Sequence, residues 1–132
     1  QNYLGSKLYD KLQALILSGD IDLAANSDYK SLRDNYIKPM LIWFTQLEYL
    51  PFAMFKIDNG GISKHRGEES DSVDYRDIDR MQSKVTDRAE FYTRRFIDYI
   101  CFHNQKFPEY NDNSNEDMYP DKDADSFSSF VL

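Results

Sequence analysis

Residues 72–105 have the sequence SVDYRDIDRMQSKVTDRAEFYTRRFIDYICFHNQ, and the spacing of these side chains decides the fold class. Mostly apolar side chains recur at steps of three and four, the period of one face of an α-helix. They are Ile78, Met81, Val85, Ala89, Tyr92, Phe96, Tyr99, Ile100 and His103. Acidic and basic residues share the opposite face and largely neutralise one another. The stretch predicts one long amphipathic helix over about 72–105.

Two further helices are predicted earlier in the chain. Residues 3–18 place leucines at steps of four and three, and Gly19 comes next as a natural helix stop. Residues 28–50 also show helical spacing. Beyond Tyr36 this second segment is apolar on nearly every side, which is typical of a central helix with neighbours all round.

Prolines and glycines predict an interruption in the second segment and a turn beyond its end. Pro39 has no N–H to donate to the carbonyl of Asn35, so a kink or break is expected there. Pro51 is expected to end the helix. Residues 54–64 combine apolar and polar alternation with the turn sequence DNGG at 58–61, which predicts a short β-hairpin.

The predicted fold is therefore mainly α, with three principal helices, a β-hairpin between the second and third, and an extended C-terminal arm. A chain of 132 residues fits one domain of ordinary size. Residues 1–107 are predicted to form the helical domain. Residues 108–132 have no helical period and are rich in Asp, Asn and Ser, so they are predicted to form an acidic extended arm.

The net charge disfavours a protein that grips nucleic acid. The chain has 16 basic and 23 acidic residues, a formal charge of −7. Residues 108–132 hold seven acids and one base, so the helical body is almost neutral. One face of the long helix carries a basic row formed by Arg76, Arg80, Lys84 and Arg88. A solvated helix face is the default interpretation, and a DNA-channel face is the alternative if many copies line a channel.

No pattern of residues indicates catalysis, a cofactor or a metal. Cys101 and His103 diverge on one helix, and His65 is the only other histidine. Asp121, Asp123 and Asp125 copy the start of an EF-hand loop, but the later glycine and glutamate positions are absent. The most apolar stretch is too often interrupted to span a bilayer. We expect no enzyme activity, no cofactor, no metal site and no membrane insertion.

Several apolar residues have no partner in this scheme and predict a second buried contact. Phe91 and Phe102 fall among the charges of the long helix, and Ile97 lies off its main apolar stripe. The arm ends in an apolar group formed by Phe127, Phe130, Val131 and Leu132. We predict that these seven residues belong to a subunit interface.

Five local sequences, in this order and spacing, resemble a known family. They are LGSKLYDKL at 4–12, YIKP at 36–39, LPF at 50–52, FKIDNGG at 55–61 and AEFYTRRF at 89–96. Together they resemble the small helical head-tail connector proteins, also called adaptor or ring proteins, of tailed bacteriophages. The version they resemble most occurs in phages and prophages of Bacteroidetes, including crAss-like phages. The resemblance covers about residues 4–107 and does not reach the arm.

The resemblance implies a virion structural protein without enzymatic activity. Protomers of that family form a ring, commonly of twelve copies, which joins the portal of the capsid to the tail and surrounds the DNA path. It implies portal and tail or neighbouring ring proteins as partners, DNA passage without sequence-specific binding, and assembly in the host bacterial cytoplasm. The residues alone leave an alternative open, namely a non-viral helical adaptor or regulator whose acidic arm binds a basic partner.

Overall fold

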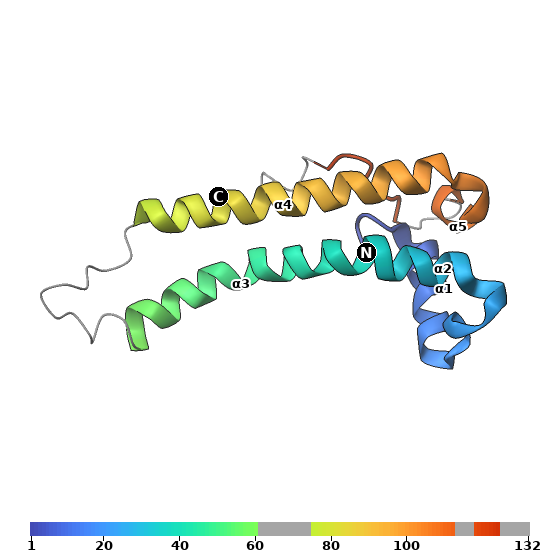
Figure 1. Ribbon diagram of the computed structural model, residues 1–132, viewed down its shortest axis with the longest axis horizontal. Helices are drawn as coiled ribbons and strands as arrows, with labels where there is room; N and C mark the ends of the chain where they lie inside the picture. Colours follow the sequence, from blue (N-terminus) through green and yellow to red (C-terminus); the bar gives the residue numbers. More distant parts are fainter. Residues whose placement is uncertain (61–74, 113–117, 125–132) are drawn as a thin grey trace, which may run out of the picture. The chain divides into compact units, whose positions relative to one another are not determined.

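The computed structural model describes residues 1–60, 75–112 and 118–124 (Figure 1). The helices are α1 (Gly5–Ser18), α2 (Ser27–Leu32), α3 (Lys38–Gly60), α4 (Tyr75–Phe102) and α5 (Pro108–Asn111), joined in part by short 3₁₀ and π turns. Over these ranges the chain contains no β-strand. The prediction of a mainly α fold is confirmed for the described part of the chain.

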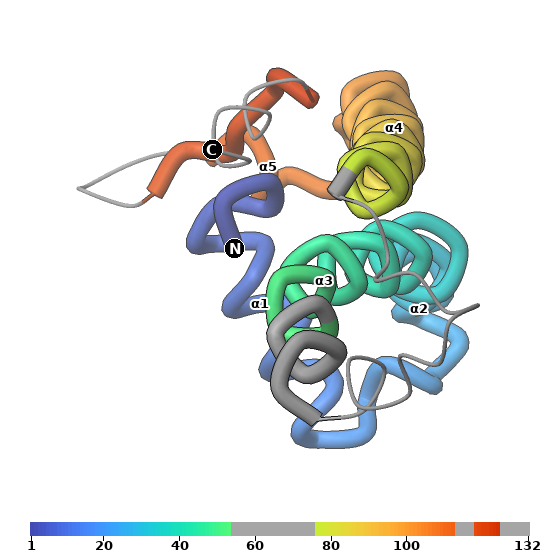
Figure 2. Tube along the Cα trace, turned by 90° about the vertical axis from the view of Figure 1, so that its left-hand side faces the viewer, coloured from blue at the N-terminus to red at the C-terminus, as the bar shows by residue number. Residues whose placement is uncertain are grey.

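The chain divides into two compact units. The terminal unit contains residues 1–40 and 90–132, and the central unit contains residues 41–89. Helices α3 and α4 each contribute to both. Within the central unit, the segments of α3 and α4 lie side by side and run in opposite directions (Figures 1 and 2).

Helix α1 agrees closely with the sequence prediction. Its apolar stripe, Leu8, Leu12 and Leu15, is buried, and it packs next to α5 (Figure 2). The helix ends at Gly19, whose φ of +79° places it in the left-handed region and whose N–H donates to the carbonyl of Ile16. Glycine adopts this conformation without steric cost, which explains why the helix stops there.

The break expected at Pro39 is a π turn that precedes the proline. Residues 33–37 form this turn, and the N–H of Lys38 donates to the carbonyl of Arg33, five residues back. A π turn widens the helix by one residue per turn, and such turns accompany sites where the ordinary hydrogen-bond ladder is interrupted. Helix α3 then continues from Lys38, with Pro39 as its second residue.

Two predictions about the region after residue 50 are wrong. Pro51 does not end the helix, because α3 continues through it to Gly60. The residues just after it, FAMFK, contain no β-branched side chain and no further helix breaker. The β-hairpin expected over 54–64 is helical as far as Gly60, and residues 61–64 lie outside the described residues. Asn59 and Gly60 therefore belong to helix α3 instead of a hairpin turn.

Part of the predicted arm packs against its own chain. Tyr110 of α5 is fully buried, and its ring meets that of Phe96 edge to face at 6.3 Å. Farther on, the N–H of Ser6 donates to the carbonyl of Met118 (3.1 Å), and the N–H of Met118 donates to Ser6 Oγ (3.0 Å). The first turn of a helix has N–H groups without intrahelical acceptors, and residue 118 supplies one for α1. Residues 113–117 and 125–132 lie outside the described residues.

Candidate interaction surface

Helix α4 has two contrasting faces within the terminal unit. Thr93, Phe96 and Ile100 are fully buried. At about 100° per residue, Phe91 and Phe102 lie on the opposite face. Their side chains are 55% and 84% exposed. Two exposed aromatic rings on one face of a helix make that face a candidate contact surface.

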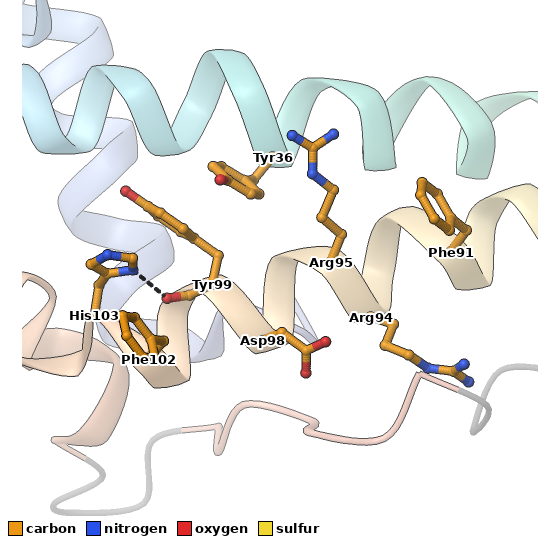
Figure 3. A pocket seen from close by; sticks show the side chains of 8 residues that line it. All are labelled: Tyr36, Phe91, Arg94, Arg95, Asp98, Tyr99, Phe102 and His103. Atoms are coloured by element: carbon orange, nitrogen blue, oxygen red, sulfur yellow. Dashed lines mark hydrogen bonds between the residues drawn. The ribbon is translucent and has the colours of Figure 1, made fainter.

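The exposed face of α4 forms one wall of a groove, which we call the aromatic groove (Figure 3). It has a volume of about 570 Å³. Tyr36 comes from the π turn, the residues from Phe91 to Phe102 come from the C-terminal part of α4, and His103 directly follows that helix. The lining residues are Tyr36, Phe91, Arg94, Arg95, Asp98, Tyr99, Phe102 and His103.

Stacked rings build one side of the groove. The rings of Tyr36 and Tyr99 lie 4.0 Å apart, with 14° between their planes. The Arg95 guanidinium lies over the ring of Tyr36, 5.0 Å from its centroid. His103 packs against Tyr99 at 4.4 Å, and its Nδ1 lies 3.0 Å from the Tyr99 carbonyl oxygen. Each of these rings is held by at least one neighbour, so the groove offers a preformed apolar surface (Figure 3).

Arg95 favours an acidic ligand segment at the groove. Arg94, Arg95 and Asp98 are the charged residues that line it, and all three are exposed. Arg95 makes the cation–π contact with Tyr36 and forms no ion pair with any described residue. Its guanidinium therefore keeps its N–H donors available to a carboxylate.

The groove offers binding contacts and no metal cluster. No group of three or more His, Cys, Asp or Glu side chains comes together in the part of the chain that the structure describes. Cys101 is an exposed free thiol, and His103 points one ring nitrogen at a backbone carbonyl. Aromatic residues and arginine are the residue types enriched at protein interfaces.

The structure separates the predicted interface residues of α4 into two groups. Phe91 and Phe102 are exposed and line the aromatic groove. Ile97 is only 8% exposed and is a core residue, so it does not form part of the exposed face. The apolar stripe predicted for α4 included Tyr92 and Tyr99. The buried face is instead centred on Thr93 and Ile100, and Ile97 lies within it. The remaining four predicted residues, Phe127, Phe130, Val131 and Leu132, lie outside the described residues.

The basic row lies on α4 in the central unit. Arg76, Arg80, Lys84 and Arg88 are all exposed. Acidic residues of the same helix, such as Asp79 and Asp87, are exposed as well. The row therefore remains a mixed, solvated surface within the described chain.

A second exposed apolar surface, on α3, was not predicted. Leu41, Ile42, Tyr49 and Phe52 fall within one stripe and are exposed, Phe52 by 71%. We call this the α3 stripe. The expectation that this segment has neighbours all round is wrong for the described chain, because only one side of the helix, with Trp43 and Phe44, is partly covered. The sequence did indicate this surface, because the segment is apolar on more sides than one neighbouring helix can bury.

Comparison with known proteins identifies a family. No helix in the described ranges is both long enough and apolar enough to cross a bilayer. The comparison with curated proteins gave no match, and neither did the comparison with solved structures. A family model matches residues 1–119, which include all five helices and the start of the segment that caps α1. The chain therefore belongs to DUF6712, a family of unknown function.

Proposed function

We propose that the protein is a subunit of an oligomeric head-tail connector ring of a tailed bacteriophage. The observation that carries the proposal is the presence of two different exposed apolar surfaces, the aromatic groove in the terminal unit and the α3 stripe in the central unit. A ring is built from heterologous contacts, in which one surface of each copy meets a different surface of the next. A chain with two unlike adhesive surfaces meets that requirement, and a chain with one does not.

The amounts of exposed apolar side chain support assembly. Large exposed apolar patches on soluble proteins usually mark interaction sites or aggregation hazards. Here the patches consist of aromatic and aliphatic side chains at regular helical spacing, such as Leu41, Tyr49 and Phe52 on one helix. Regular spacing of this kind suits a partner helix or an extended segment.

The charge distribution supports a role around a DNA path. The helical body is nearly neutral, while the acids concentrate in residues 108–132. A strongly basic lumen would hold DNA through its phosphates, whereas a nearly neutral one lets it pass. In this proposal Arg76, Arg80, Lys84 and Arg88 are the candidate channel residues, and binding is not specific for sequence.

The sequence resemblance supplies the biological setting of the proposal. The ring, commonly of twelve copies, joins portal and capsid to the tail in the virion neck, after assembly in the host bacterial cytoplasm. Portal protein and tail or neighbouring ring proteins are the partners. The proposed role is structural and uses neither an enzyme activity nor a cofactor.

Light scattering and negative-stain imaging of the purified protein, alone and with portal, test the proposal. We expect rings, either spontaneously or after portal is added. Phe52→Ser should weaken assembly, while Leu17→Ser, at an exposed position of α1 that belongs to neither surface, should leave it intact. A chain that stays monomeric with portal present contradicts the connector role and favours the alternative of a non-viral adaptor with an acidic partner-binding arm.

A further inference from the structure

We propose that the α3 stripe of one copy packs antiparallel along the aromatic groove of a neighbouring copy. The inference rests on the proposed function only in requiring a second copy of the chain. It adds what the assembly proposal leaves open, namely that the two exposed surfaces bind each other, and in which register. The observation behind it is a match of spacing and charge between α3 and α4.

Both helices carry exposed residues at the same spacing, steps of four, three and four. On α3 they are Leu41, Thr45, Glu48 and Phe52. On α4 they are Phe91, Arg95, Asp98 and Phe102. Such steps form the contact line of a coiled coil, along which one helix packs against another. The two ends of each line are eleven residues apart, about 16 Å along the helix, so the lines are equal in length.

The apolar ends of the two lines meet in one antiparallel register. Phe52 then lies opposite Phe91, and Leu41 lies opposite Phe102. All four side chains are more than half exposed in the single chain. Packing them against one another removes apolar side chains of both surfaces from water, which favours association.

The polar residues between these ends are complementary in the same register. Glu48 is exposed and is the single charged residue of α3 between residues 41 and 53. It lies opposite Arg95, the exposed cation that stacks on Tyr36. Neither Glu48 nor Arg95 forms an ion pair with any described residue of its own chain. Thr45, which is small and uncharged, lies opposite Asp98.

The parallel direction is disfavoured by the same residues. With Leu41 opposite Phe91, Glu48 would lie opposite Asp98, and two carboxylates would face each other. Like charges opposite one another weaken an interface and suppress the wrong arrangement. Polar residues within the contact line of a coiled coil specify its register in this way.

The chain's own α3 does not supply this contact. The π turn and α3 form one continuous helical run, so the register that pairs Leu41 with Phe102 would place Tyr36 opposite Phe107. Within one chain Tyr36 instead stacks on Tyr99 at 4.0 Å. The difference is eight residues, about 12 Å along a helix, and a shift of that size would break the stack. A neighbouring copy therefore supplies the stripe.

Packing in this way is heterologous. Each copy presents its α3 stripe to one neighbour and its aromatic groove to another, so the two halves of the contact differ. Contacts of this type build rings when the rotation between neighbours closes. The inference thus accounts for both exposed surfaces with one interface.

Disulfide trapping between full-length chains tests the inference. One preparation carries Thr45→Cys, and a second, with a different tag, carries Asp98→Cys, because these positions lie opposite each other in the proposed register. Both also carry Cys101→Ser to remove the native thiol. Mild oxidation of the mixture should give a disulfide-linked pair of differently tagged chains. The absence of such a pair overturns the inference.

A matched variant controls for chance collision. Gln46→Cys replaces Thr45→Cys, because Gln46 is the next residue of α3, is also exposed, and points about 100° away from the contact line. This variant should lose most of the yield, and equal yields overturn the inference. A further preparation, with Thr45→Cys and Asp98→Cys in one chain, tests contact within the chain. A linked monomer that dominates at every protein concentration also overturns the inference.

Exchanging the two opposite charges tests the register. Glu48→Arg in the Thr45→Cys chain puts two cations opposite each other and should slow disulfide formation about tenfold. Glu48→Gln, which removes the attraction without adding repulsion, should give an intermediate rate. Adding Arg95→Glu to the Asp98→Cys chain should restore the rate lost through Glu48→Arg. Equal rates for all of these combinations overturn the register.

The trapping result and the assembly result are separable. Rings that form without this disulfide overturn the inference and leave the connector proposal standing. Linked pairs without rings in the presence of portal support the packing of stripe against groove and contradict the connector role.

Discussion

The ring of Tyr36, carried by a π turn, lies 4.0 Å from the ring of Tyr99 and nearly parallel to it. The contact joins the second helical segment to the last turns of α4 inside the terminal unit. Arg95 extends the stack by placing its guanidinium 5.0 Å from the Tyr36 centroid. A cation and two rings in one stack make Tyr36 the residue on which the shape of the aromatic groove depends.

Replacing Tyr36 by leucine should destabilise the protein by about 1–2 kcal/mol, because the aromatic pair and the cation–π contact are lost while apolar volume is kept. Tyr36→Phe, the control, keeps the ring and should be nearly neutral. Denaturant unfolding monitored by circular dichroism measures both. Equal losses for the two variants would mean that the hydroxyl, and not the stack, matters.

Gly5→Ala should be clearly more costly than Gly19→Ala. Both glycines have positive φ, +75° and +79°. A Cβ on Gly5 would lie 3.0 Å from Pro120 Cδ and 3.1 Å from the Met118 carbonyl oxygen, whereas Gly19 has nothing within 4 Å. The backbone cost of about 1 kcal/mol is common to both, so the difference in unfolding free energy reports the packing of residues 118–120 on α1.

Tyr29→Phe should cost about 1–3 kcal/mol, because a half-buried carboxylate loses its donor. The Tyr29 hydroxyl donates to Glu109, at 2.8 and 3.0 Å from the two carboxylate oxygens. Burial and the hydrogen bond to Glu109 raise the pKa of Tyr29 above its usual value of 10.0. The contribution of this tyrosine is therefore complete below pH 10 and decreases at higher pH. Tyr49→Phe, at an exposed site of α3, is the control for unfolding measurements.

Stability should fall in acid partly through Asp34. Hydrogen bonds from Arg33 (2.8 Å) and Lys38 (3.2 Å) lower the pKa of its carboxyl from 3.8 to about 2. A lowered pKa in the folded state contributes stability above pH 3.8, and this is lost as the pH falls through about 2. Asp34→Asn should flatten the dependence of the unfolding midpoint over that range. Asp10→Asn, at an exposed aspartate with no ion pair among the described residues, should not.

Phe102→Ser and Phe96→Ala should differ sharply in a monomeric preparation at low concentration. Phe102 is 84% exposed, so its removal should change the unfolding free energy by less than about 0.5 kcal/mol. Phe96 is fully buried, and its truncation should cost about 3–5 kcal/mol. A large loss for Phe102→Ser in the monomer would mean that this ring belongs to the fold and not to an interface.

Helices α1 and α4 were predictable because their apolar positions make regular stripes that one chain buries. The end of α1 was predictable from Gly19, and the interruption near Pro39 from the missing N–H. The sequence did not distinguish a π turn from a kink, because a helix can accommodate the missing N–H of a proline in either way. The turn-like residues 58–61 led to the wrong prediction, since glycine and asparagine end helices as readily as they form hairpins.

The candidate site was predictable only in part. Phe91 and Phe102 stood out because two phenylalanines among charges have no neighbour in a simple helical scheme. The α3 stripe was not predicted, because an apolar helix face was assumed to be buried within its own chain. Hydrophobicity alone does not show whether the same chain buries such a face. The attachment of residues 118–121 to the start of α1 uses mostly backbone groups, as between Ser6 and Met118, and such contacts leave almost no trace in a sequence.

The capping of α1 by Met118 has a consequence for synthesis on the ribosome. The central unit is continuous in sequence, so it can form as soon as residue 89 has emerged. The terminal unit contains residues that precede the central unit and residues that follow it. The Ser6 N–H of α1 obtains its acceptor, the Met118 carbonyl, only when residue 118 has emerged. Because chains fold as they are translated, at about 5–20 residues per second, helix α1 is completed only after α2, α3 and α4 have been made. The central unit, with the α3 stripe, can therefore form before the terminal unit that carries the aromatic groove has closed.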